Sequence, residues 1–159
     1  MEKSNDFDGT VRILVVNHNG IFREGLRSFI EANSDMKLAG AVADADTALG
    51  LFAAAQPDLT LVDLNLPFGR STDLIRRIRE MDADAWIVGL VTYEWDERGA
   101  EALAAGASAV LSKDLISERL QSLVRSGPQS SPPPARVKES PTRWRTYLRG
   151  LLAHSDLRA

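Results

Sequence analysis

The strongest constraint on the fold is a repeated change of hydrophobic periodicity between residues 11 and 124. Short apolar runs rich in β-branched residues are typical of strands that are covered on both faces. The segments between them place apolar side chains at helical spacing, with charged residues on the opposite side. The predicted strands are residues 11–16, 37–42, 59–64, 85–91 and 108–112, and the predicted helices are residues 21–32, 45–55, 72–81, 97–105 and 116–124.

Strict alternation of strands and helices requires crossover connections, which give a parallel sheet with helices on both faces. In such a sheet the ligand site lies beyond the carboxyl ends of the strands. Polar side chains stand at these strand ends: Asn17 and His18 after the first strand, Asp63 at the third, Thr92 at the fourth and Lys113 at the fifth. We therefore expect a carboxylate, a hydroxyl and an ammonium group to meet in one crevice.

The order of elements and these three groups resemble the receiver domain of two-component response regulators, over roughly residues 11–125. By this resemblance Asp63 matches the phosphoacceptor, while Thr92 and Lys113 match the hydroxyl and the lysine that contact the phosphoryl group. The resemblance implies a flavodoxin-like, doubly wound (βα)5 fold with five parallel strands in the order 2-1-3-4-5. Three further segments resemble the NarL/LuxR-type subgroup, whose receivers precede a DNA-binding domain: Arg23-Glu24-Gly25-Leu26, Gly106-Ala107 and Lys113-Asp114.

The positions that hold Mg²⁺ in this family differ here. Asn17 and His18 match the two acidic residues, and neither supplies a carboxylate. The backbone carbonyl near Asn65 matches the remaining protein ligand, so Asp63 is the only acid in the matched set. Since Mg²⁺ prefers oxygen ligands and neutralises charge in phosphoryl transfer, its binding is expected to be weak or absent, and no cofactor is predicted. We expect an ion pair between Asp63 and Lys113 to replace the metal and to favour one conformation.

A second departure concerns the family's switch residue. Val110 stands where the resemblance places an aromatic ring that rotates inward, and its branched side chain is typical of a buried strand. The relay from Thr92 to the fourth helix is therefore expected to be absent. A purely architectural interpretation also stays open, with Asp63 as a strand-end acid, Thr92 as an N-cap of the next turn and Lys113 as a tether.

His18 has three interpretations. A solvated loop residue is the simplest. Histidine titrates near neutral pH, so His18 is also a candidate pH sensor beside Lys113. A transition-metal site shared with Asp63 is the third, although one histidine and one carboxylate make a poor site.

The two ends of the chain differ from residues 11–125. Residues 1–10 are expected to be disordered. Residues 126–141 are rich in proline and serine and are expected to form an extended linker. A basic amphipathic tail helix is predicted for residues 142–159. A helix of this length is only marginally stable alone in water, so we expect it to bind a partner surface. Its apolar residues are Trp144, Tyr147, Leu148, Leu151 and Leu152, and its basic residues are Arg143, Arg145 and Arg149. It weakly resembles the first helix of a LuxR-type helix-turn-helix domain. Without a recognition helix, specific DNA binding by a complete domain is not expected.

Composition bears on the number of domains, the distribution of charge and the expected compartment. The 159 residues are 44% hydrophobic and contain no cysteine, which suits one domain stabilised by packing. Residues 1–126 hold 13 basic against 20 acidic residues, a net charge of −7, and residues 127–159 hold 6 against 2, a net charge of +4. The sequence has no transmembrane stretch and no export signal at its polar N-terminus, so we expect a cytoplasmic protein.

These features predict an atypical receiver that is not an enzyme and that works in signalling through protein contacts, independently of Mg²⁺ and phosphate. Expected partners are a second copy, another regulator or a histidine kinase, and the resemblance points to residues 97–124 and the first helix as contact surfaces. One alternative is a conventional receiver with slow phosphorylation of Asp63. Another is a phosphate-ester hydrolase with Asp63 as nucleophile, which lacks a metal and a second acid. A last alternative is a nucleic-acid or membrane-surface binder acting through the basic tail.

Overall fold

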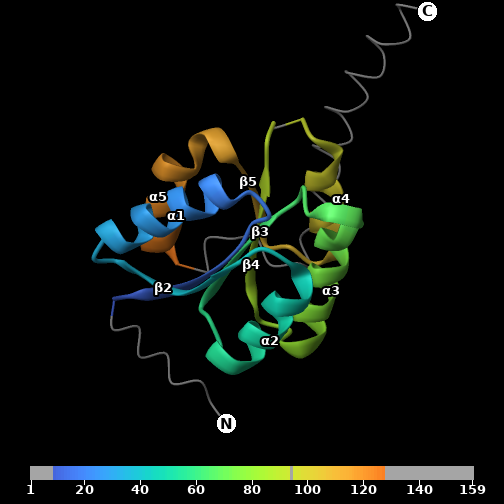
Figure 1. Cartoon of the computed structure of the whole chain (residues 1–159), viewed down its shortest axis with the longest axis horizontal. Helices are drawn as coiled ribbons and strands as arrows, with labels where there is room; N and C mark the ends of the chain where they lie inside the picture. The colour runs from blue at the N-terminus through green and yellow to red at the C-terminus, as the bar shows by residue number, and fades with distance from the viewer. Residues whose placement is uncertain (1–8, 94, 128–159) are drawn as a thin grey trace, which may run out of the picture.

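The computed structural model describes residues 9–93 and 95–127 as one α/β body (Figure 1). Five strands form one sheet in the order β2-β1-β3-β4-β5, and all neighbouring strands are parallel. The predicted fold class is therefore confirmed. The strands are β1 (Val11–Val16), β2 (Met36–Val42), β3 (Leu59–Asp63), β4 (Trp86–Val91) and β5 (Ala109–Ser112), and the α-helices are α1 (Gly20–Ala32), α2 (Ala45–Ala55), α3 (Arg70–Met81), α4 (Glu97–Ala105) and α5 (Ile116–Ser126).

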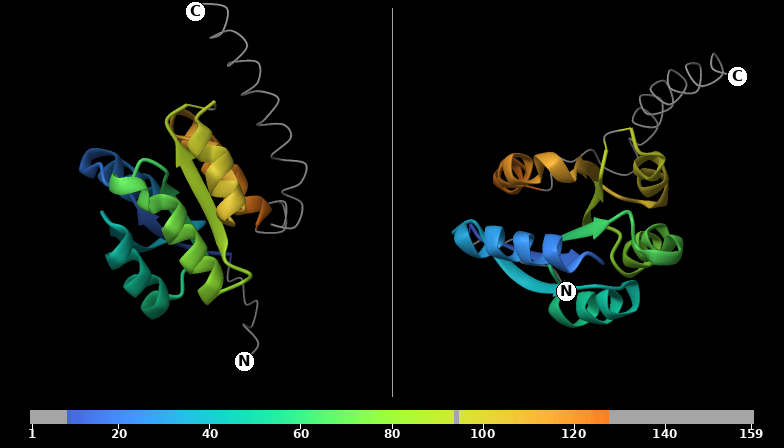
Figure 2. Two further views of the ribbon diagram at one scale, coloured as in Figure 1. Left: turned by 90° about the vertical axis from the view of Figure 1, so that its right-hand side faces the viewer. Right: turned by 45° about the horizontal axis from the view of Figure 1, so that its top comes forward.

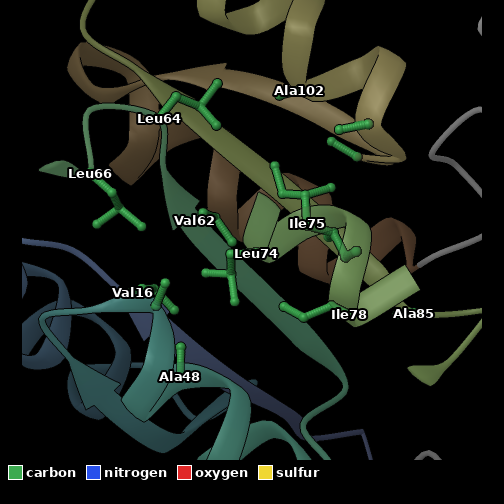
Figure 3. Packing of buried hydrophobic residues seen from close by; sticks show 14 of the residues in the cluster. Val16, Ala48, Val62, Leu64, Leu66, Leu74, Ile75, Ile78, Ala85 and Ala102 are labelled. Carbon is green, nitrogen blue, oxygen red and sulfur yellow. The ribbon is translucent and has the colours of Figure 1, made fainter. Parts of the chain in front are cut away.

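The helices cover both faces of the sheet and create two apolar clusters. Helices α1 and α5 lie on one face, and α2, α3 and α4 lie side by side on the other (Figure 2). Successive residues of a strand point to opposite faces, so Ile13 and Val15 join the cluster under α1 and α5 whereas Leu14 and Val16 join the other. Figure 3 shows Leu74, Ile75 and Ile78 of α3 packed over Val62 in this second cluster. The central strands therefore need apolar residues on both faces.

Short polar side chains fix where several helices begin. Asn19 accepts hydrogen bonds from the N–H groups of Ile21 and Phe22 at the start of α1, and Asp44 accepts one from Thr47 at the start of α2. The hydrogen bonds from Thr47 also lower the pKa of Asp44. Such caps satisfy backbone donors that have no partner within the helix, so the sequence itself sets these boundaries.

Two short 3₁₀ helices were not predicted, η1 (Pro67–Gly69) and η2 (Lys113–Leu115). The first leads directly into α3, which therefore begins at Arg70, two residues before the predicted start. At the other end α5 runs to Ser126 and stops at Gly127, whose φ of 73° favours glycine. The remaining element ends agree with the prediction or differ from it by one residue, which is within the usual uncertainty of helix and strand ends.

The prediction that Val110 is buried is wrong, because its side chain is only half-buried. Strand β5 stands at the edge of the sheet and has a neighbour only on the β4 side. An edge position leaves a strand less covered than a central one. The predictions for residues 1–8 and for residues 128–159, which include most of the linker and the whole tail, lie outside the described residues. Within residues 9–93 and 95–127, no helix is long and apolar enough to span a membrane.

Candidate functional site

A buried carboxylate and a partly buried ammonium group meet at the carboxyl end of the sheet. Asp63 is the last residue of β3 and only 2% exposed, and Lys113 follows β5 at the first position of η2. Lys113 Nζ lies 2.9 Å from Asp63 Oδ1, with 17% of the lysine side chain exposed. The same Nζ lies 5.4 Å from the centroid of the Phe22 ring of α1, within the range of a cation–π contact. The charge of Lys113 is thus engaged by a carboxylate and an aromatic face.

The loop after β3 adds hydrogen bonds that hold Asp63 in place. The Asn65 N–H donates to Asp63 Oδ1 at 3.0 Å. The Ser71 hydroxyl donates to the Asp63 carbonyl at 2.8 Å and accepts from the Leu66 N–H at 3.3 Å. Sequence reasoning missed Ser71, which is buried at the first turn of α3. A small hydroxyl residue at the start of the helix that follows a site strand is the signal that would have identified it.

Thr92 contacts the neighbouring loop and does not cap the next helix. Asn65 Nδ2 donates to Thr92 Oγ1 at 3.0 Å, which joins the loop after β3 to the loop after β4. The N-cap of α4 is Asp96, whose carboxylate accepts from the Arg98 N–H at 3.0 Å. Thr92 is therefore not the N-cap of α4. The structure does bring Thr92, Asn65 and Asp63 to the same edge of the sheet.

Asn17 lies beside Asp63, on the adjacent strand. Val16 pairs with Val62 in the parallel register, so the next residues along β1 and β3 are neighbours as well. Asn17 is fully buried, and its Oδ1 accepts from the Asn19 N–H at 2.9 Å. Its Nδ2 is buried without a partner in the described part of the chain. Arg23 donates to the Asn17 carbonyl at 2.8 Å and brings a positive charge to the same strand end.

These residues do not fit Mg²⁺ as a pair of acids would. The side-chain oxygen of Asn17 is already engaged, and the free end of its amide is a donor, which cannot ligate a cation. His18 is exposed, and residues 9–93 and 95–127 contain no group of three or more His, Cys, Asp or Glu side chains placed to hold a metal. Asp63 is the one carboxylate at the matched positions, so water and loop carbonyls would have to supply the other oxygen ligands of Mg²⁺, without the second acid that would strengthen its binding.

Phe68 occupies a strained backbone conformation in the loop after β3. Its φ is 61° and its ψ is 26°, the left-handed region that is unfavourable for a residue with a bulky side chain. Its side chain is 98% exposed. Neither property helps folding, since the strain is unfavourable and an exposed ring gains nothing from burial.

This strain predicts that Phe68→Asn stabilises the protein. Asparagine tolerates the left-handed region, so the free energy of unfolding is expected to rise by about 0.5–1 kcal/mol. Phe68→Ala is the matched control, because it removes the ring but keeps the unfavourable φ, so it should lack the stabilisation expected for Phe68→Asn. Urea unfolding followed by circular dichroism measures both. Equal effects of the two substitutions would show that the conformation of Phe68 is not strained.

The geometry of the site agrees with a comparison of the sequence with known families. Residues 13–125 match the family model of the response regulator receiver domain. The chain belongs to this family. The receiver contains the matched aspartate, hydroxyl and lysine of the family as Asp63, Thr92 and Lys113, and the structure places all three at one edge of the sheet. Their roles toward a phosphoryl group stay predictions.

Several characterised regulators are similar to this receiver. The transcriptional regulatory protein YdfI of Bacillus subtilis is 33% identical over 109 residues, which cover 69% of this chain and 51% of YdfI. The nitrate/nitrite response regulator NarL of Escherichia coli is 28% identical over 108 residues, which cover 68% of this chain and 50% of NarL. The chain thus spans about half the length of these relatives. A LuxR-family response regulator from Aurantimonas sp. SI85-9A1 shares the fold, with a TM-score of 0.68 at 24% identity over 86% of this chain and 99% of that one.

Family membership settles the class of function. Receiver domains are non-enzymatic signalling domains of two-component systems, so the chain is a response regulator receiver that acts in two-component signal transduction. The alternative of a phosphate-ester hydrolase is therefore wrong. The receiver is most similar to NarL/LuxR-type regulators, and its relative YdfI is named as a transcriptional regulatory protein.

Proposed function

We propose that this receiver works through protein contacts in a single conformation of its site, without Mg²⁺ and without phosphate on Asp63. The contact between Lys113 Nζ and Asp63 Oδ1 at 2.9 Å is the observation that carries the proposal. A receiver with three clustered carboxylates has repelling charges that a cation must neutralise. Here one carboxylate meets one ammonium group, and the pair is neutral without a metal.

The surroundings of the pair favour the same conclusion. Asp63 is buried and also accepts the Asn65 N–H, while Lys113 contacts the Phe22 ring. Phosphorylation of Asp63 would add negative charge to a carboxylate that is almost inaccessible to water, with no second acid to hold Mg²⁺ beside it. Val110 offers no aromatic ring that could change position in response. The site is thus built for one state.

The partner is a protein in this proposal. A histidine kinase, another regulator and a second copy of the chain are the candidates, and residues 97–124 and α1 are the proposed contact surfaces. For the whole protein we propose a role in transcription regulation, as the names of its relatives suggest. Specific DNA contact is not assigned to the described residues.

Slow phosphorylation is the second candidate function, and the position of Thr92 favours it. Asp63, Thr92 and Lys113 lie together at the sheet edge, and the Thr92 hydroxyl is held there by Asn65. A hydroxyl and an ammonium group are suitable donors to the oxygens of a phosphoryl group. Phosphate on Asp63 that is acid-labile and released by hydroxylamine, after incubation with a small phosphodonor and Mg²⁺, would establish this function.

The proposal predicts that tryptophan fluorescence does not change in a titration with Mg²⁺ and beryllofluoride. Trp95 is half-exposed in the loop after β4, at the carboxyl end of the sheet, so its fluorescence reports changes around the site, whereas Trp86 is buried at the amino end of β4. We expect no saturable change, and the same flat response from Asp63→Asn. A saturable change in the wild type that disappears in Asp63→Asn would show that the phosphorylation switch survives and would refute the proposal.

A further inference from the structure

Three aromatic side chains are exposed beside the site. Phe68 of η1 is 98% exposed, Tyr93 is 53% exposed and Trp95 is 48% exposed. The rings of Tyr93 and Trp95 stack with centroids 5.0 Å apart and planes 11° apart. The hydrogen bond between Asn65 and Thr92 joins the loop of Phe68 to the loop of Tyr93 and Trp95. We call these three residues the aromatic rim. Exposed aromatic groups of this kind are typical of protein contact sites.

A hollow of about 240 Å³ opens beside Phe68, between the loop after β3 and helix α4. Leu64 and Leu66 give it an apolar floor, and both are buried in the cluster seen in Figure 3. Arg98 and Glu101 of α4 line the opposite side. The hollow is large enough for one large apolar side chain, and a contact surface there would combine it with the aromatic rim.

The charges around the hollow favour a basic partner. Arg98 is paired with Asp96 at 3.3 Å, so its charge is largely neutralised. Glu97 and Glu101, one helical turn apart on α4, are exposed and form no ion pair within the described ranges. Two unpaired carboxylates beside exposed aromatic groups are complementary to a segment that carries arginine and large apolar residues at helical spacing.

The chain itself contains such a segment. Residues 142–152 carry basic and apolar side chains at the spacing of an amphipathic helix. The helix that this pattern predicts is too short to be stable alone. We propose that residues 142–152 dock in cis against the aromatic rim and the hollow, with Trp144 or a leucine of the segment in the hollow and arginines near Glu97 and Glu101. The inference adds an intramolecular contact to the protein-contact function proposed above and rests on it. It also gives the strained, exposed Phe68 a role.

The connecting residues are long enough for this contact. Residues 128–141 number 14, and a proline-rich chain extends about 3.1 Å per residue, giving a reach of about 43 Å. The connection must follow the surface of a body roughly 35 Å in diameter, and its shortest route from Gly127 to α4 passes round the edge strand β5, which lies between α5 and α4. A short tether also gives an effective concentration on the order of millimolar, which favours docking in cis over docking on a second molecule.

Paramagnetic broadening in the full chain tests the inference. The chain has no cysteine, so Ser155→Cys carries a single nitroxide label just after the proposed docking segment. In nitrogen-15-labelled protein we expect the amide signals of Thr72, Arg98 and Glu101 to be broadened several-fold more than those of Glu118 and Arg119 on α5. A mixture of isotope-labelled protein without nitroxide and nitroxide-labelled protein without isotope should show no such broadening, because docking is in cis.

Matched variants separate the proposed surface from general effects. The double substitution Phe68→Ala with Glu101→Arg should abolish the broadening, and Glu118→Arg on the exposed side of α5 should leave it unchanged. Absence of broadening, its persistence in the double variant, or its appearance in the mixture would overturn the inference. Asp63→Asn should keep the broadening, since the measurement uses neither Mg²⁺ nor a phosphodonor. The outcome is therefore distinguishable from that of the beryllofluoride titration.

Discussion

Replacement of Lys113 by methionine is expected to lower the free energy of unfolding by about 3 kcal/mol, because it leaves the Asp63 carboxylate buried without its counter-charge. Asp63 is 2% exposed, and among the described residues its carboxylate then keeps only the Asn65 N–H as a hydrogen-bond donor. Methionine preserves most of the apolar stem of the lysine, so lost packing contributes little. Urea unfolding at neutral pH measures the effect, and the midpoint should fall at an unchanged slope.

Two further variants show whether the ion pair itself causes the loss. Arg77→Met breaks an exposed ion pair with Asp73, at 3.2 Å on α3, and is expected to cost at most about 0.5 kcal/mol. Adding Asp63→Asn to Lys113→Met should recover most of the lost stability, since no buried charge then remains. A loss below about 1 kcal/mol in Lys113→Met would contradict a paired, buried carboxylate. Additive losses in the double variant would do the same.

Restoration of the acidic pair, Asn17→Asp with His18→Asp, is expected to convert the site into one that depends on Mg²⁺. Asn17 is buried beside Asp63, so a second carboxylate there should lower the free energy of unfolding by about 2 kcal/mol without metal. Mg²⁺ at about ten times its dissociation constant should return about 1.4 kcal/mol by binding only the folded state. Thermal unfolding with and without Mg²⁺ measures both changes.

The controls for this experiment lie in the same site. The wild type should show no stabilisation by Mg²⁺, because Asn17 presents a donor where the metal needs an oxygen. Addition of Asp63→Asn to the restored variant should remove the response to Mg²⁺, since Asp63 is then no longer a ligand. Equal stabilisation of wild type and restored variant would show that the present residues already bind the metal.

The sequence alone predicted the fold because its signals are local. Periods of two and 3.6 residues distinguish strands from helices, and caps such as Asn19 and Asp44 mark helix starts within a few residues. Strict alternation then leaves a parallel sheet as the arrangement, and a parallel sheet puts every strand's carboxyl end at one edge. For this reason Asp63, Thr92 and Lys113 could be assigned to one site before any coordinates were known.

Other features of the site depend on contacts between distant segments. A hydroxyl residue at the start of α3 marks Ser71 as a candidate, but its bond to the Asp63 carbonyl depends on the fold. No local pattern showed that Asn65 Nδ2 donates to the Thr92 hydroxyl or that the Phe22 ring faces Lys113. The choice of Asp96 as the N-cap of α4 depends on the backbone path of the loop after β4. The predicted strand order already put residues 108–112 at the edge of the sheet, but the apolar, β-branched sequence of the strand does not show how much of Val110 is covered there.

The sequence thus determined the alternation of strands and helices, the placing of helices on both faces of the sheet and the identity of the groups at the site. Each of these follows from side-chain chemistry at fixed spacing along the chain. Only the tertiary structure decided how those groups pair. It set the 2.9 Å contact of Lys113 with Asp63, the strained and exposed Phe68, and the hollow beside α4. These depend on the distance between segments that are far apart in sequence, and that distance is fixed only when the two faces of the sheet are packed.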